Sequence, residues 1–466
     1  MRRSVPTAVP RWCAAIGALL LATSLVGRAE TIPSWLDPYR DAAGRLIGAA
    51  LADDFAWQRL AELTDTFGPR LSGTQNLEDA IAWIAGEMRA DGLENVRTEP
   101  VMVPHWVRGE ETLEIVSPGP RSLPLLGLGG SIGTPPGGIT AESLVVSSFD
   151  DLDARAAEAS GRIVVYNVPY QGYGTTVPYR TGGASRAARH GAVAALVRSI
   201  GPMGLRTPHT GGMRYDPDQP EIPVAAISAE DAAMLQRMQD RGTRVTLRLG
   251  MEAHFEPDAP SSNLMAEIPG RDVPEEIVVI GCHIDSWDPA MGASDDAGGC
   301  IVTWDALRLM KQLGLQPRRT VRVVLWTNEE NGLRGATAYR DAHADELDRT
   351  VMMLESDSGV FEPAGFGFTG SAEARRIVTD IATLLDVIGA NAIGPQGGGA
   401  DIGPSVEAAN IPALSLEVGG DYFLIHHSPA DTVDRINPAD VARNAAAIAV
   451  MTYVIAEMPE RLPKVE

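Results

Sequence analysis

The sequence contains the stretch Ile277-Val-Val-Ile-Gly-Cys-His-Ile-Asp285 and, further on, Val321-Arg-Val-Val-Leu-Trp-Thr-Asn-Glu-Glu330. Each stretch opens on a largely apolar run and closes on acidic or imidazole side chains. Such runs are typical of strands that are buried on both faces of a sheet. Between the two lies 298–313, where apolar residues recur at helical spacing. Alternating strands and helices predict an α/β fold with a mostly parallel central sheet covered by helices.

The same pattern continues toward the C-terminus. The apolar runs 351–355 and 413–418 are two more expected strands, and 439–458 is a long helix with an apolar stripe. Residues 32–110 have helical periodicity, seen most clearly at 80–91.

The middle of the chain differs in character. Residues 111–254 contain short β-rich runs separated by loops rich in Gly, Pro and Ser. We therefore expect a β-rich domain inserted at 111–254 between the two parts of the α/β domain, 30–110 and 255–466. The segment 256–262, with its two prolines, reads as the linker out of the insert.

The net charge of the chain and its N-terminal residues indicate which partners the protein binds and where it is located. Of 466 residues, 61 are acidic and 39 basic, for a net charge of −22, which disfavours binding to nucleic acid. Arg2, Arg3 and Arg11 precede the apolar run 13–26, and small residues precede Glu30. This pattern predicts a secretory signal at 1–29, cleaved after Ala29, and a secreted or periplasmic product with no membrane partner. The run is shorter than the ~20 residues of a spanning helix.

Two cysteines, Cys282 and Cys300, remain after the signal peptide, which contains Cys13, is removed. The sequence leaves open whether they pair. Their apolar surroundings favour buried free thiols.

Imidazoles and carboxylates gather at the ends of the expected strands. Because the carboxyl ends of parallel strands share one edge of a sheet, these side chains are expected to lie together. They are His283, Asp285, Asp295, Asp296, Glu329, Glu330, Glu355, Asp357, His426 and His427. Singly, each is more often a surface pair, a solvated loop or a helix cap. Together, so many carboxylates need cations, and the mixture with histidine suits two divalent ions that share a bridging carboxylate, with zinc the expected metal.

The motifs that carry these residues are recognisable. They are His283-x-Asp285, Gly292-Ala-Ser-Asp-Asp296, Asn328-Glu-Glu330, Glu355-Ser-Asp357 and His427-x-x-x-Asp431. They resemble those of the co-catalytic di-zinc exopeptidases, a family that includes secreted aminopeptidases and glutamate carboxypeptidase. Further segments, among them 67–73, 104–111 and 161–167, resemble one member of that family more than the others. The similarity covers about residues 50–460.

The resemblance implies a role for each residue. Two Zn²⁺ per chain would be held by His283, Asp295, Asp357, Glu330 and His427, with Asp295 bridging. Glu329 would be the general base toward a metal-activated water, and Asp285 would orient His283 through its second ring nitrogen. The resemblance also implies a protease-associated-like insert and a homodimer.

The expected activity is hydrolysis of short peptides, especially dipeptides with both termini free. The alternatives are an aminopeptidase acting on the N-termini of longer peptides and a non-catalytic peptide-binding protein that kept the fold. A serine hydrolase is disfavoured, because the G-x-S-x-G pattern at 129–133 is followed by two prolines where the elbow would need a helix.

Three positions depart from the family pattern. Asn328 stands where Ala is common before the Glu pair. His426 stands where some relatives have an oxyanion-binding tyrosine, and the sequence leaves open whether it donates to the oxyanion or supports His427. The loop around Asp401 falls where relatives have a substrate-side Asp, but its Gly-Pro is unusual there, so the side-chain preference is open.

Overall fold

The structure is a computed structural model that describes residues 32–464. Its first sheet has eight strands in the order β1-β10-β12-β11-β13-β16-β14-β15. The strands are β1 (Glu94–Val107), β10 (His254–Ile268), β11 (Val273–His283), β12 (Arg319–Trp326), β13 (Thr350–Glu355), β14 (Pro363–Thr369), β15 (Ala392–Gly394) and β16 (Ala413–Val418). The four central strands, β12, β11, β13 and β16, are parallel, and antiparallel pairings flank them. The sheet is therefore mixed, with the predicted parallel strands at its centre.

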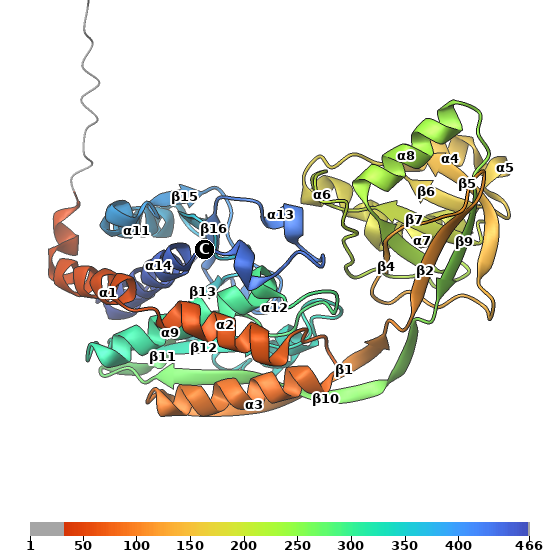
Figure 1. Ribbon diagram of the computed structural model, residues 1–466. Coiled ribbons are helices and arrows are strands. Elements are labelled where there is room, and N and C mark those ends of the chain that lie inside the picture. Colours follow the sequence, from red (N-terminus) through yellow and green to blue (C-terminus); the bar gives the residue numbers. More distant parts are fainter. Residues whose placement is uncertain (1–31, 465–466) are drawn as a thin grey trace, which may run out of the picture.

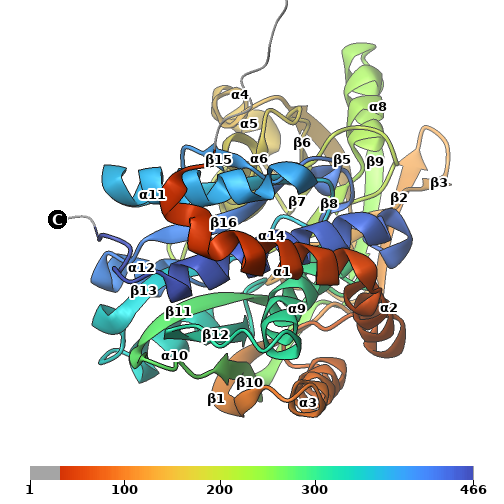
Figure 2. The same ribbon diagram turned by 90° about the vertical axis from the view of Figure 1, so that its left-hand side faces the viewer.

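Helices cover both faces of this sheet. They are α1 (Arg40–Ala52), α2 (Phe55–Phe67), α3 (Gln75–Ala90), α9 (Gly298–Gln312), α10 (Arg334–Ala342), α11 (Ala372–Ala382), α12 (Gly403–Ala409), α13 (Tyr422–Ile425) and α14 (Pro438–Glu457). Alternate strand residues face opposite layers: Val278 and Ile280 pack under α1, α9 and α14, whereas Ile277 and Val279 pack under α10 and α12 (Figure 2).

By length and hydropathy α14 could cross a membrane. Most of its residues are buried in the protein core, as in the central helix of many soluble proteins.

A second sheet lies at the other end of the molecule (Figure 1). Its strands are β2 (Glu111–Ser117), β3 (Arg121–Ser122), β4 (Leu125–Gly127), β5 (Ile139–Val146), β6 (Ile163–Tyr166), β7 (Ala194–Arg198), β8 (Val224–Ile227) and β9 (Thr246–Met251). The helices α4 (Phe149–Ala154), α5 (Ala156–Ala159), α6 (Tyr173–Thr176), α7 (Pro178–Ala188) and α8 (Ala229–Asp240) accompany it. We call this part of the chain the insert.

Two expectations about the connections were wrong. Residues 94–107 form strand β1 rather than helix, and the expected linker 256–262 lies inside β10. The two strands pair antiparallel into a long ribbon that joins the sheets, visible along the lower edge of Figure 1. At Pro257 and Pro260 strand β10 has β1 as its one neighbour, and proline is tolerated in strands with a free edge.

The two cysteines form a disulfide, which corrects the expectation of free thiols. Cys282 is near the end of β11 and Cys300 is in the first turn of α9, with their Cα atoms 5.1 Å apart. Because α9 packs on β11, it brings two buried thiols within the distance that a disulfide requires.

Candidate metal centre

The structure brings the predicted ligands together beyond the C-terminal ends of the parallel strands. His283 ends β11, Asp357 follows β13, and Glu330 follows β12. Asp295 lies on a π-helical turn, Ala293–Ala297, immediately before α9, and His427 follows α13. Four of the five are buried, and Asp357 is half-buried.

One group of three ligand atoms forms around His283. Its Nε2 is 3.2 Å from Asp295 Oδ1 and 3.4 Å from Asp357 Oδ1. A second group forms around His427, whose Nε2 is 3.1 Å from Asp295 Oδ2 and 3.0 Å from Glu330 Oε2. The two carboxylate oxygens of Asp295 therefore face different histidines, as a bridging ligand requires.

These spacings suit a small divalent cation. For ligands ~2.0–2.1 Å from a tetrahedral zinc ion, neighbouring ligand atoms are about 3.3 Å apart. His283 Nε2 and Asp295 Oδ2 are buried and have no hydrogen-bond partner among the described residues. Buried polar atoms rarely stay unpartnered, so their convergence fits a cation between them.

The electrostatics of the centre also reflect an excess of buried carboxylates. Burial, and after it the charge of Asp295, raises the pKa of Glu330 to about 7. Burial raises the pKa of Glu329 well above its ordinary value, with Asp357 and Glu330 acting in the same direction. Since like charges crowd one another here, a divalent cation would stabilise the ionised forms.

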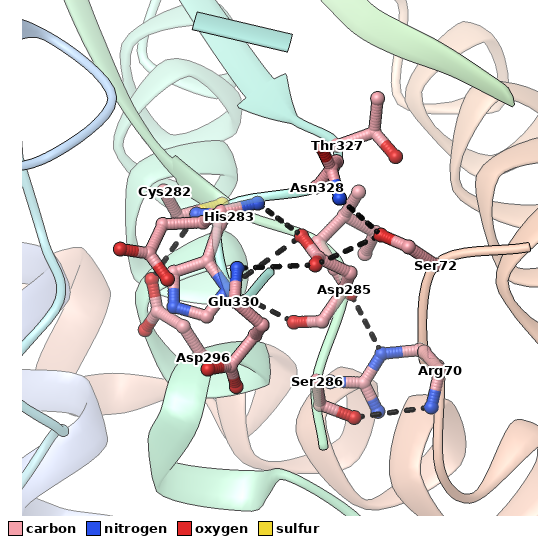
Figure 3. A network of polar contacts seen from close by, with 12 residues as sticks. Arg70, Ser72, Cys282, His283, Asp285, Ser286, Asp296, Thr327, Asn328 and Glu330 are labelled. Carbon is pink, nitrogen blue, oxygen red and sulfur yellow. Dashed lines mark hydrogen bonds and ion pairs between the residues drawn. The ribbon is translucent and has the colours of Figure 1, made fainter. Parts of the chain in front are cut away.

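Asp285 does contact the second ring nitrogen of His283, but through its main chain rather than its carboxylate. His283 Nδ1 is 2.9 Å from the main-chain oxygen of Asp285, and 3.9 Å from its carboxylate. The carboxylate instead accepts from the backbone N–H of Glu329 at 3.0 Å and of Glu330 at 3.4 Å, and from Ser72 Oγ (Figure 3). Asp285 thus fixes the loop that presents the glutamate pair.

Two further positioning residues, Arg70 and Asp431, lie in segments that the resemblance covers but were not predicted as site residues. Arg70 is completely buried and donates to the carbonyls of Gly68, Ile284, Met291 and Gly292, which clamps two loops of the centre (Figure 3). Asp431 accepts from the backbone N–H groups of Ser294 and Asp295 and thereby fixes the bridging residue.

The two remaining candidates from the sequence, His426 and Asp401, differ in where their side chains lie. His426 lies beside the centre, with Nε2 3.6 Å from Asp295 Oδ2 and its ring stacked on that of His427. Burial, and then the neighbouring His427, hold its pKa well below the ordinary value, so the ring is neutral. Asp401 is fully buried behind the centre, and Ala400 of the same loop reaches the cavity instead.

A cavity of about 900 Å³ opens over this centre. Its lining includes Asp295, Glu329, Glu330, Asp357, Tyr422, His426 and His427 from the α/β part, and Gly130, Tyr173, Arg180 and Met213 from the insert. The contributions from the insert could not be expected from the sequence, because they depend on how the insert docks. The size is ordinary for a site that binds a small molecule.

Comparisons with known proteins place the chain in a family. Residues 263–452 match the model of Peptidase family M28. Carboxypeptidase Q from Mus musculus is 46% identical over 430 residues, which cover 91% of each chain. This chain belongs to peptidase family M28. The resemblance that the motifs indicated is confirmed.

Other members of family M28 are also similar. Carboxypeptidase Q from Homo sapiens is 46% identical over 427 residues, covering 91% of this chain and 90% of the relative. The crystal structure of a peptidase M28 precursor from Shewanella amazonensis has a TM-score of 0.89 at 34% identity, over 92% of this chain and 99% of that one. A zinc aminopeptidase from Bacillus subtilis, 21% identical, shares the fold with a TM-score of 0.65, over 88% of this chain and 97% of that one.

Proposed function

We propose that this M28 peptidase is an exported zinc exopeptidase that hydrolyses short peptides. The observation that carries the proposal is the placement of Asp295, whose two carboxylate oxygens face two different histidines. Two Zn²⁺ would be held there, one by His283, Asp295 and Asp357 and the other by His427, Asp295 and Glu330. Zinc supplies a Lewis acid that polarises the scissile carbonyl and lowers the pKa of water.

Glu329 is the proposed general base. It lines the cavity beside the ligand groups, and its backbone N–H is fixed by Asp285. Its carboxylate accepts the proton of the attacking water and passes it to the leaving amine. A raised pKa suits a group that takes up and releases a proton in one cycle.

The substrate class follows from the shape of the site. Residues of the insert line one side of the cavity, whose volume of about 900 Å³ has room for a peptide of a few residues rather than a folded protein. The similarity to carboxypeptidase Q supports dipeptides with free termini as the first substrates to test. An aminopeptidase acting on longer peptides is the alternative, supported by the fold shared with the Bacillus enzyme.

A matched pair of variants tests the mechanism. Glu329→Gln should retain zinc and lose several orders of magnitude in kcat, because the base and the metals act as a unit. Glu330→Gln should instead lose metal during dialysis against a chelator, because it removes a ligand charge. Metal content by mass spectrometry and turnover of a dipeptide, measured on both variants, separate the roles. Near-normal turnover in Glu329→Gln would show that the base is another group.

A second experiment addresses which terminus is read. Each dipeptide that the zinc-loaded enzyme cleaves is compared with its N-acetylated and its C-amidated form. Loss of cleavage on amidation supports the carboxypeptidase activity, and loss on acetylation alone supports the aminopeptidase. Binding of peptides without hydrolysis would favour the non-catalytic alternative.

Export and assembly complete the proposal. The N-terminal pattern supports cleavage after Ala29, so the exported product should begin at Glu30. N-terminal sequencing of protein from the periplasm or the medium tests this. We also propose the homodimer, which sedimentation of the purified product would test.

A further inference from the structure

The disulfide between Cys282 and Cys300 closes a ring of the chain that contains two of the proposed metal ligands. His283 is the first residue inside this ring, and Asp295 lies five residues before Cys300. The ring therefore supplies two of the three ligands in the group around His283, but one of the three in the other group. We call residues 283–299 the disulfide ring.

Much of the disulfide ring lacks regular secondary structure. Residues 284–292 belong to no helix or strand, and the π-helical turn Ala293–Ala297 follows them. Because the backbone of such a segment has no ladder of hydrogen bonds, its order depends on cross-links to other parts of the chain. Arg70 and Asp431 supply polar cross-links, and the disulfide supplies a covalent one.

The disulfide restrains the backbone of His283 rather than its imidazole. Successive side chains of a strand point to opposite faces, and Cys282 packs in the core with residues of α9, on the other face from that imidazole. Cys300 Sγ lies 3.1 Å from the main-chain oxygen of His283, and the Cα atoms of the two cysteines are 5.1 Å apart. The end of β11 and the start of α9 are thus joined directly beside a ligand.

Without the bridge, the disulfide ring would gain conformations in which its ligands cannot meet one cation. Closing a loop removes conformational entropy before a metal arrives, and that entropy is then not lost on binding. Ligands held in place in advance therefore bind an ion more tightly than mobile ones. The second group depends less on the ring, because Glu330 and His427 lie on other loops.

We propose that the Cys282–Cys300 disulfide controls zinc retention at the ligand group of His283, so that the oxidised chain holds both ions and the dithiol chain releases that one first. This inference rests on the proposed zinc centre. The disulfide forms when the two thiols pass two electrons and two protons to a disulfide oxidant, which becomes two thiols. Because such bonds form and persist in export compartments rather than in the cytosol, the metal centre would be completed after export.

The main test removes the bridge with Cys282→Ala and Cys300→Ala together. Zinc binding to the metal-free variant and parent is measured by competition with a chelator of known affinity, and zinc per chain by mass spectrometry. One ion should bind roughly 10- to 100-fold more weakly in the variant, the range typical of lost support around a metal site, while the other changes little. Asp357→Asn, which removes a ligand of the His283 group alone, identifies the affected step of the titration.

Hydrogen–deuterium exchange gives a readout that needs neither zinc nor activity. In the metal-free variant, peptides covering 284–297 should exchange faster than in the parent, and those covering 329–332 should not. Leu307→Ala is the control for lost stability, because it truncates a buried side chain of α9 and leaves the bridge intact. It should retain both zinc ions with the affinity of the parent.

The wild-type chain in its dithiol state gives a second form of the test, which does not depend on the folding of the alanine pair. A phosphine reductant, applied to the unfolded chain, converts the disulfide to two thiols and takes an oxygen from water to become a phosphine oxide. After refolding, the dithiol form should lose one zinc ion to the chelator well before the oxidised form does.

Several outcomes would overturn the proposal. They are unchanged affinity for both ions, an equal loss of both, and the same loss in Leu307→Ala, which would make the disulfide a contributor to general stability. Failure of both the variant and the dithiol form to fold would have the same meaning. If zinc binding depends on the disulfide as expected but no peptide is hydrolysed, the exopeptidase function fails while the role of the disulfide stands.

Discussion

Asp295 determines the spacing of the centre, because its two oxygens lie 3.2 and 3.1 Å from two different histidines. Asp431 fixes Asp295 through its backbone N–H, and the residue is almost completely buried. Burial would raise the pKa of Asp295, but His283 and His427 hold it well below the ordinary value. The carboxylate of Asp295, proposed to bridge two zinc ions, is therefore ionised in the metal-free protein, and the surrounding side chains are already in place.

Two roles fit the position of His426: it donates a hydrogen bond to an oxyanion, or it supports His427. It lines the cavity, is neutral, and has Nδ1 buried without a partner among the described residues. A neutral imidazole can donate to an oxyanion that develops over the centre. We predict that His426→Ala retains zinc and substrate affinity while kcat falls by ~10²–10³, the usual cost of one oxyanion donor. Stopped-flow turnover with metal analysis checks this. Unchanged kcat would remove His426 from the mechanism, and zinc loss would make it a support of His427.

Among single residues, the sequence predicted the proposed metal ligands but not the two buried arginines beside them, Arg70 and Arg180. His283, Glu330 and Asp357 follow buried strands, and parallel strands end at one edge, so their meeting could be expected. Arg180 and Arg70 carry no such signal. Arg70 acts through carbonyls, and the position of Arg180 depends on the docking of the insert, which no local pattern specifies.

Among the elements, the insert segment 199–214 makes the closest approach to the centre. Thr210 N–H donates to the carbonyl of His427 at 2.8 Å, and Gly201 lies against the carbonyl of Phe423. The ring of Phe423 stacks on Tyr173, 5.3 Å between centroids (Figure 1 shows α6 facing α13). The hydrogen bond from Thr210 restrains the backbone of His427, which has a left-handed conformation with φ 58°.

Gly211 permits that approach. Its φ is +128°, and a Cβ there would collide with Arg180 Nη1 and lie 2.7 Å from His427 Nδ1. Gly211→Ala should push the segment away from the centre and lower kcat/KM at least tenfold, with the α/β part still folded. Gly204→Ala is the control, since its Cβ would be 3.4 Å from Leu424, an ordinary contact, in the same segment. Equal activity of the two variants would contradict the proposed docking.

His209, in the same segment, should make stability depend on pH. Burial lowers its pKa to about 3, with His427 and Arg180 acting in the same direction. Between pH 6.5 and about 3 the unfolded chain binds a proton there that the folded chain does not. Stability should therefore fall as pH falls, by up to ~1.4 kcal/mol per pH unit from this group. His209→Gln should flatten the curve of unfolding free energy from pH 7.5 to 5.5, measured by chemical denaturation of variant and parent.

The central strands could be predicted from the sequence, whereas the β1–β10 ribbon could not. The strands β11, β12, β13 and β16 were expected because they are short, apolar and buried on both faces. The ribbon of β1 and β10 was missed. Much of it is exposed, it contains four prolines, and its backbone hydrogen bonds join residues 147 to 173 positions apart in the sequence rather than local neighbours.

In the whole molecule, side-chain contacts fix the insert against the α/β part, in addition to the β1–β10 ribbon that connects them. Trp287, from the loop after β11, packs into the core of the insert against Trp106 and directly over Gly129. Beside it, Arg108 at the end of β1 donates to both oxygens of Asp288, at 2.6 and 2.5 Å, and to the carbonyl of Gly127. These contacts fix the position of the insert relative to the metal centre.

Asp288→Asn tests whether that separation matters for catalysis. It removes the charge that pairs with Arg108 but leaves the Trp287 packing, so the protein should stay folded and keep its zinc. Charge-assisted bonds contribute ~1.5–3 kcal/mol, and weakening them should let the insert move relative to the centre. We expect faster hydrogen–deuterium exchange in 199–214 and a fall of about tenfold in kcat/KM for dipeptides. Glu114→Gln, which breaks the exposed pair with Arg248 inside the insert, is the control and should change neither. If Asp288→Asn exchanges and turns over like the control, the Arg108 pair contributes to neither docking nor catalysis.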